Sequence, residues 1–202
     1  MRPGKIIDEQ NGWQTISRQT HFDDGHLELV TEFVRTPNAS TGRKWTTVHR
    51  KAAVVVAPML PNGDLVLIRQ ERIPVRAAIW EMPAGQIDER HDFEAAAVEA
   101  VALRELKEEA GYQLVHGGEL IPLGHFFSSP GFTDEHAFLF LARHVEVAPE
   151  GHAHTESESI VDCRSFSPRE IARLITNGEI RDANTLATCA RMVAAGLLSF
   201  YA

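Results

Sequence analysis

The segment from Arg104 to Tyr112 constrains this chain more than any other, because it gathers three carboxylates on one side of a single helix. The run Ala95 to Ala110 predicts a helix that ends at Gly111, a residue suited to the left-handed conformation that follows a helix. At about 100° per residue, three carboxylates project from one side of this helix. They belong to Glu105, Glu108 and Glu109. The adjoining face, which we expect to pack against a core, carries Ala102, Leu103, Leu106 and Ala110.

Carboxylates that share a helix face repel one another, so this cluster needs a partner. A hard divalent cation such as Mg²⁺, which takes oxygen ligands, would relieve the repulsion. Arg104 precedes Glu108 at the spacing of a helical salt bridge and could orient the cluster. The alternative is a solvated acidic helix surface, which accounts for most charge runs of this length.

The rest of the chain alternates between strand and helix signals. Alternation from His26 to Phe33 and the run Lys44 to His49 flank a turn-rich stretch, which predicts strand, turn, strand. Further strands are expected at Ala52–Pro58, Leu65–Ile68, Ala137–Arg143 and Ile160–Phe166, the first two joined by a tight turn at Asn62-Gly63. Capped helices are expected to begin after Ser167 and after Asp182. This order predicts an α/β sandwich with a mixed sheet.

Composition excludes several classes of protein. The net charge is −8, and no cluster of Lys and Arg resembles a track for a phosphate backbone, so we expect no nucleic acid polymer as partner. The longest apolar run, Ala52 to Leu60, is far shorter than the roughly 20 residues that span a bilayer, so we expect no membrane association. The first residues carry no secretory signal pattern, and we expect a cytoplasmic protein. An acidic chain can still bind a small phosphate compound through metal ions.

Together with the segment Trp80–Asp88, the glutamate helix resembles the signature of the Nudix hydrolases, Arg-Glu-Leu-x-Glu-Glu-x-Gly preceded by a glycine-containing loop. Three other segments resemble the ADP-ribose pyrophosphatase branch of that family: Leu67–Arg72, Ser129–Glu135 and Gly178–Leu186. The similarity runs from about residue 25 onward, and the motifs occur in the family's order. The resemblance implies a Nudix-type α/β/α sandwich with an N-terminal β appendage, divided into residues 1–50 and 51–202.

The resemblance also implies a set of site residues. Mg²⁺, or Mn²⁺ in its place, would be held by Glu105, Glu109 and the main-chain carbonyl of Ala84, with Glu108 supporting directly or through water. Arg104 belongs to the same catalytic group. Arg72 and Arg69 are candidates for the diphosphate of the substrate, because a guanidinium fork suits phosphate oxygens; the alternative is that they are surface arginines.

The chain departs from the family pattern between Gly85 and Arg104, where it is longer by a short insertion. His91 stands where the family's first glutamate is expected. Glu94 cannot replace it on a continuous helix, because it would lie roughly 16 Å along the axis from Glu105. The first, more peripheral carboxylate of the motif is therefore not assigned to any residue, whereas the metal-binding pair Glu105 and Glu109 is intact.

A general base should come from outside the helix, since the helix glutamates are committed to metal. In the resembling pyrophosphatases the base lies on a loop after the strand that corresponds to Ala137–Arg143. That loop carries Glu156 and Glu158 here, which rank first and second. Glu135, on the other side of that strand, ranks third as a base and is also a candidate for substrate binding. The alternative for each is a solvated loop acid.

These assignments predict a Mg²⁺-dependent enzyme that hydrolyses the diphosphate bond of a nucleoside diphosphate sugar. ADP-ribose, giving AMP and ribose 5-phosphate, is the expected substrate. Alternatives are GDP-mannose, a dinucleotide such as NADH, or a non-catalytic nucleotide sensor on the same fold. The resemblance further implies a homodimer, in which the N-terminal strands reach across to the partner and complete the nucleotide pocket.

Overall fold

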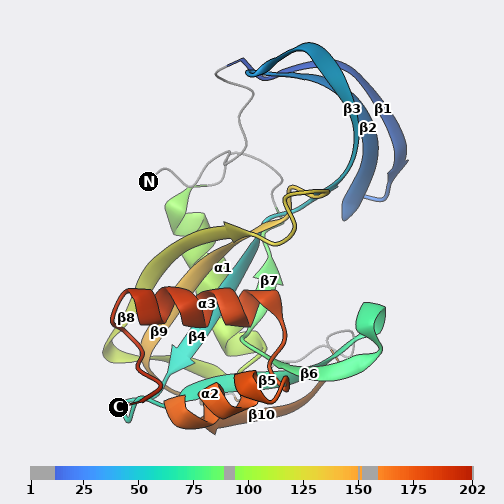
Figure 1. Cartoon of the computed structure of the whole chain (residues 1–202). Helices are drawn as coiled ribbons and strands as arrows, with labels where there is room; N and C mark the ends of the chain where they lie inside the picture. The colour runs from blue at the N-terminus through green and yellow to red at the C-terminus, as the bar shows by residue number, and fades with distance from the viewer. Residues whose placement is uncertain (1–11, 89–93, 150, 152–158, 202) are drawn as a thin grey trace.

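The computed structural model describes residues 12–88, 94–149, 151 and 159–201 (Figure 1). Within these residues the chain forms a three-stranded sheet and a seven-stranded sheet, with helices on both faces of the larger one. The strands are β1 (Gln14–Asp23), β2 (Leu27–Thr36), β3 (Ala39–Arg50), β4 (Ala53–Met59), β5 (Leu65–Arg72), β6 (Ala77–Glu81), β7 (Ala84–Gln86), β8 (Tyr112–Phe127), β9 (His136–Val147) and β10 (Ile160–Phe166). The helices are α1 (Ala95–Glu108), α2 (Pro168–Thr176) and α3 (Ala183–Ala194), with a short 3₁₀ turn at Ile73–Val75.

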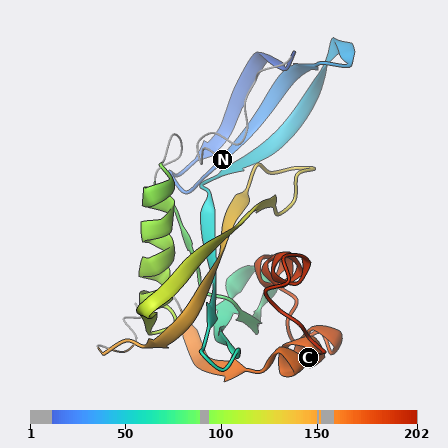
Figure 2. The same cartoon turned by 90° about the vertical axis from the view of Figure 1, so that its left-hand side faces the viewer.

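The larger sheet follows the order β10-β5-β4-β9-β8, with β6 paired to β5 and β7 paired to β4. It is mixed, because β4 and β9 run parallel while its other pairs are antiparallel. Helix α1 covers one face, and α2 and α3 lie on the opposite face (Figure 2). The predicted α/β sandwich with a mixed sheet is confirmed.

Strand β4 is buried on both faces, which explains its unbroken apolar sequence. Val54 and Val56 pack toward α1, and Val55 and Ala57 pack toward α3. The α1 residues in this core are Val98, Ala102 and Leu106. Leu103 was expected to join them, but it is 41% exposed, so this prediction is wrong: the apolar stripe of α1 is narrower than its sequence indicated.

Strands β4 and β5 separate soon after the turn that joins them. Gly63 adopts a φ of 90°, as the Asn-Gly sequence predicts. The two strands nevertheless form a ladder only at Met59 and Leu65, and then separate. Beyond that point β6 pairs with β5 and β7 pairs with β4. The connection from β6 to β7 is thereby held between the two halves of the sheet, facing the end of α1.

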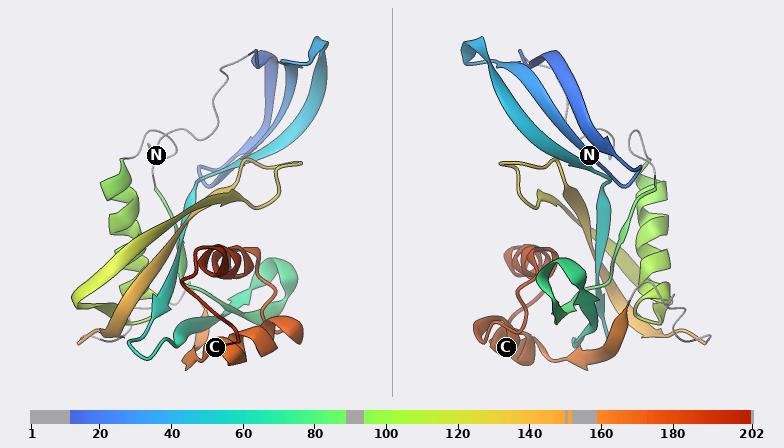
Figure 3. Two further views of the ribbon diagram at one scale, coloured as in Figure 1. Left: turned by 60° about the vertical axis from the view of Figure 1, so that its left-hand side comes forward. Right: turned by 90° about the vertical axis from the view of Figure 1, so that its right-hand side faces the viewer.

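The three-stranded sheet projects from the rest of the molecule, and its contacts with the larger body lie near the end of β3 (Figure 3). Val48 donates its backbone N–H to the carbonyl of Phe132, at 2.9 Å. Asp134 binds the next two residues of the strand, with 2.7 Å to His49 Nδ1 and 2.9 Å to the backbone nitrogen of Arg50. None of the helices in the described ranges is long and apolar enough to cross a membrane.

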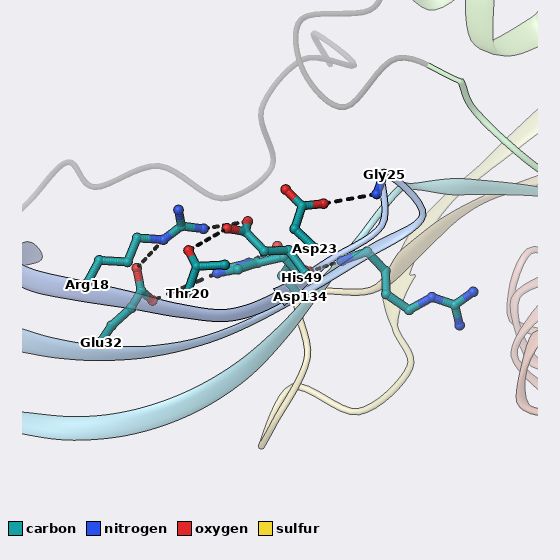
Figure 4. Close-up of polar contacts among 9 residues, drawn as sticks. Arg18, Thr20, Asp23, Gly25, Glu32, His49 and Asp134 are labelled. Carbon is teal, nitrogen blue, oxygen red and sulfur yellow. Dashed lines mark hydrogen bonds and ion pairs between the residues drawn. The ribbon is translucent and has the colours of Figure 1, made fainter.

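At this junction His49 lies between two carboxylates, with Nδ1 at 2.7 Å from Asp134 and Nε2 at 3.9 Å from Glu32 (Figure 4). The hydrogen bond that His49 donates to Asp134 raises the pKa of His49 against the opposing effect of burial. The charges of Asp134 and Glu32 add to the rise, while that of Arg18 opposes it. A raised pKa in the folded chain means that protonated His49 stabilises the fold below its unfolded pKa. This stabilisation is lost as the pH rises through the pKa of the folded state.

We therefore expect His49→Gln to lower the melting temperature at pH 6 and to have little effect at pH 9. The melting temperature at pH 6 should fall by roughly 2–4 °C more than at pH 9, since a partly exposed pair such as His49 and Asp134 contributes about 1 kcal/mol or less. Thermal unfolding followed by circular dichroism at both pH values measures it. His116→Gln on β8 is a control for the loss of an imidazole elsewhere. An equal destabilisation by His49→Gln at both pH values would contradict the expectation.

Candidate active site

Two glutamates, one in the last turn of α1 and one at its C-terminal cap, meet the main chain of β7. Glu105 and Glu109 are one helical turn apart, so they share a face. Both are buried, with exposed fractions of 6% and 4%. The backbone N–H of Ala84 donates to Glu109 Oε2 at 2.7 Å. At Gly85 a Cβ atom would lie only 2.0 Å from Glu105 Oε1, so a glycine is required for the carboxylate to approach the strand this closely.

Arg104 holds two of the carboxylates from the rim of the site. Its guanidinium lies 2.8 Å from Glu105 Oε1 and 3.1 Å from Glu108 Oε2. The side chain of Glu108 is about as exposed as that of Arg104, whereas Glu105 is buried. The predicted orienting contact between Arg104 and Glu108 is confirmed, and Arg104 reduces the repulsion within the cluster.

The donor set suits a hard divalent cation that keeps part of its hydration shell. In the described ranges no three His, Cys, Asp or Glu side chains converge to form a metal site from side chains alone. Here two buried carboxylates, Glu105 and Glu109, instead lie against the main chain at Ala84 and Gly85. Mg²⁺ is commonly bound by one or two carboxylates, with waters and substrate phosphates filling the other positions. The residues present therefore fit a partly hydrated Mg²⁺ better than a metal ion that is fully enclosed by protein side chains.

Arg72 lies at the end of β5, and Glu81 at the end of β6 holds its guanidinium. Arg72 Nη2 is 2.5 Å from Glu81 Oε2, and its Nε donates to both carboxylate oxygens at 3.0 Å. Burial alone would lower the pKa of Arg72, but the ion pair with Glu81 outweighs this effect and raises it, and Glu109 and Asp182 add to the rise. Arg72 is thus a charged guanidinium within the electrostatic field of Glu109.

Arg69 is separated from Arg72 by the sheet. Residues three apart on a strand point to opposite faces. Leu65 and Leu67, on the side of Arg69, pack in the core cluster that includes α2 and α3. Arg69 lines a pocket of that face with Trp80 and Arg181. The structure does not bring the two predicted phosphate-binding arginines together, and only Arg72 lies on the α1 side with Glu109.

The three candidate bases are in different positions. Glu135 already has partners, with Oε1 at 2.6 Å from Arg50 Nη1 and Oε2 accepting from the hydroxyl of Ser128 at 2.7 Å. These contacts give it a role at the junction between the two sheets. Glu156 and Glu158 lie outside the described residues, as does His91, and their assignments remain predictions.

Sequence reasoning missed two features of the site. Glu81 was not expected as the partner of Arg72, although its isolated charge within an otherwise apolar strand was a usable signal. Thr185 was not singled out at all, yet its hydroxyl accepts the backbone N–H of Met82 at 2.9 Å, next to the glutamate site.

Comparison with known proteins identifies the family of this chain. The model of the NUDIX domain family matches residues 48–189. The chain belongs to the Nudix family. The predicted family is thereby confirmed, and the matched residues include α1.

Several Nudix relatives are similar over most of their length. An ADP-ribose pyrophosphatase of Bacillus subtilis is 30% identical over 172 residues, which cover 85% of this chain and 88% of that protein. An ADP-ribose pyrophosphatase of Mycobacterium tuberculosis is 29% identical, covering 88% and 82%. A methanol dehydrogenase activator of Bacillus methanolicus is 30% identical, covering 91% of each chain. The predicted class of enzyme, a Nudix pyrophosphatase, is supported by these relatives.

A solved structure of an ADP compounds hydrolase has the same fold. It superimposes with a TM-score of 0.72 at 16% identity and covers 93% of this chain and 97% of that one. At this level of identity the match bears on the fold alone, and its extent includes the N-terminal sheet as well as the Nudix domain.

Proposed function

We propose that this Nudix protein hydrolyses the diphosphate bond of a nucleoside diphosphate sugar in a Mg²⁺-dependent reaction. ADP-ribose is the preferred substrate of this proposal, and AMP and ribose 5-phosphate are the products. The observation that carries the proposal is the convergence of buried Glu105 and Glu109 on the main chain at Ala84 and Gly85. The similarity to two ADP-ribose pyrophosphatases supports the choice of substrate.

The chemistry of a diphosphate accounts for this donor set. Water attacks a phosphorus atom that is surrounded by negative oxygens, and the departing phosphate carries negative charge as well. Mg²⁺ bound by Glu105, Glu109 and the Ala84 carbonyl, with Glu108 in support, supplies neutralisation of that charge and activation of water. Mn²⁺ would serve the same oxygen ligands.

The chain's own side chains have complementary tasks. Arg72, aligned by Glu81, binds nonbridging phosphate oxygens through its guanidinium. Arg104 keeps Glu105 and Glu108 oriented. A carboxylate from the loop before β10, Glu156 or Glu158, accepts the proton of the attacking water.

A panel of substrates tests the proposal. The protein is incubated with Mg²⁺ and ADP-ribose, another ADP-sugar, GDP-mannose or NADH, and the products are then treated with alkaline phosphatase. Only the phosphomonoesters released by cleavage yield inorganic phosphate, because the intact diphosphates have no terminal phosphate. We expect the highest kcat/KM for ADP-ribose, and no reaction after chelation of the metal.

Two outcomes would revise the proposal. A higher kcat/KM for GDP-mannose or NADH would change the substrate and leave the reaction in place. No phosphate release from any compound, together with measurable nucleotide binding, would favour the non-catalytic sensor.

We also propose that the N-terminal sheet pairs two copies of the chain in a homodimer. Phe22 on β1 lies opposite Leu29 on β2, and Leu29 lies opposite Val48 on β3, so all three share one face of the sheet. Phe33 belongs to the same face, four residues after Leu29. Phe22 is 50% exposed, and no helix covers this sheet in the described chain. A small sheet with an uncovered apolar face is stabilised by burial against a partner.

Light scattering at micromolar concentration should therefore report twice the mass of one chain. Phe22→Asp should shift the equilibrium toward the monomer and lower activity, because a buried charge at the interface is unfavourable. Val161→Asp on β10, which replaces an equally exposed apolar residue far from this sheet, is the matched control. A fully active monomer would contradict the proposal.

A further inference from the structure

The motif Gly178–Leu186 has no task in the function proposed above, although it is one of the segments that resemble the ADP-ribose pyrophosphatases. It joins α2 to α3 and contains the start of α3. Asp182 caps that helix, because its Oδ2 accepts the backbone N–H of Thr185 at 2.8 Å. An ordinary helix cap would consist of this bond alone.

Thr185 extends the cap into a second contact. The hydroxyl of Thr185 donates its hydrogen to the same Asp182 Oδ2 at 2.9 Å. The lone pairs of the hydroxyl oxygen, Thr185 Oγ1, remain available as acceptors. That oxygen accepts the backbone N–H of Met82 at 2.9 Å, across 103 positions of sequence. Thr185 is fully buried and Met82 is nearly so. Water therefore does not compete for this bond, and the N–H of Met82 would be left buried and unpaired without it.

The bond from Met82 to Thr185 holds the first residue of the segment 82–84, which leads from β6 into β7. The last residue of this segment contacts Glu109. At its middle, the carbonyl of Pro83 accepts the N–H of Val56 at 2.9 Å. At its far end, Ala84 donates to Glu109 at 2.7 Å. Residues 82, 83 and 84 are thus hydrogen-bonded in turn to α3, to β4 and to the C-cap residue of α1. These three bonds, together with the pairing of β7 with β4, restrain the main chain that carries the Ala84 carbonyl.

We propose that Thr185 is a positioning residue for metal binding: oriented by Asp182, its hydroxyl fixes the main chain at Met82 so that the carbonyl of Ala84 faces the same ion as Glu105 and Glu109. The inference rests on the proposed function, since it concerns the same metal. Thr185 touches neither metal nor substrate and acts through the backbone.

The test is the affinity of the full chain for Mn²⁺ without substrate, measured by electron paramagnetic resonance of the free ion. Thr185→Val keeps the shape of the side chain and removes the hydroxyl, and we expect roughly 10-fold weaker binding, as for other residues that orient a metal ligand. Thr185→Ser restores the hydroxyl and should bind Mn²⁺ like the wild type. With ADP-ribose, Thr185→Val should need more Mg²⁺ for half-maximal kcat, while KM for ADP-ribose at saturating Mg²⁺ stays unchanged.

Thr188→Val is the matched control. Thr188 is also fully buried on α3, but its hydroxyl donates to the carbonyl of Asn184 within the same helix, at 2.7 Å. It should lower the melting temperature without weakening Mn²⁺ binding. Equal Mn²⁺ affinity of Thr185→Val and the wild type, or equal weakening by Thr188→Val, would overturn the inference alone. A wild-type chain that binds Mn²⁺ with this pattern but cleaves no nucleotide sugar would overturn only the proposed function.

Discussion

Glu109→Gln is expected to reduce turnover of ADP-ribose by orders of magnitude while the chain stays folded. The substitution removes one charged ligand from a shared metal site, and it barely changes helix propensity or side-chain volume. The amide oxygen of glutamine can still accept the N–H of Ala84, so the contact with β7 is preserved. The measurement is kcat as a function of Mg²⁺ concentration, with circular dichroism as a check on the fold.

Other glutamates of α1 provide the comparison. Glu105→Gln should be as damaging as Glu109→Gln, because both carboxylates are buried at the same place. Glu99→Gln, on the exposed side of the helix, should leave turnover unchanged. Near-normal turnover of Glu109→Gln at limiting Mg²⁺ would refute the metal assignment.

A second large effect is expected from the loop before β10. Replacing the general base by glutamine removes the proton acceptor, and positioned acid–base groups contribute at least roughly 10²-fold. We expect this loss of kcat at saturating Mg²⁺ for Glu156→Gln, or failing that for Glu158→Gln. The affected variant should also lose the acidic limb of the pH–rate profile.

Glu135→Gln is the informative comparison, since Glu135 already binds Arg50 and Ser128. It should reduce stability more than kcat. If neither loop variant lowers kcat by roughly 10²-fold, the idea of a base on that loop is wrong.

Local signals were enough to predict the helices of this fold. Gly111 ends α1 with a φ of 71°, and Ser167 and Glu170 form the expected reciprocal cap of α2. Each of these features depends on residues within one helical turn. For the same reason the glutamate face of α1 could be read directly from its spacing.

Strands were harder to predict where burial follows no simple pattern. Strand β1 was not predicted, because almost all of its residues are exposed and its sequence shows no alternation. Strand β8 contains Gly117, Gly118 and Pro122, which resemble turns, and its pairing with β9 shifts register in that region. Tertiary pairing determines both strands.

The hydrogen-bond partners of the site residues could not be predicted from local sequence either, because they too depend on tertiary pairing. Arg72 was predicted from its motif, but its bond to Glu81 depends on the pairing of β5 with β6. Asp182 was predicted as a helix cap, whereas the bond from Met82 to Thr185 depends on how α3 packs against the sheet. Spacing along one element cannot reveal such contacts.

The bond between Met82 and Thr185 also orders events during synthesis. A chain emerges from the ribosome N-terminus first, so β7 and the glutamates of α1 are exposed well before α3 is made. Until Thr185 arrives, the N–H of Met82 lacks its partner in the folded chain. By our proposal the metal ligands can therefore be aligned only after α3 has been made, and a fragment that stops after α2 would contain every proposed metal ligand but not the residue proposed to align them.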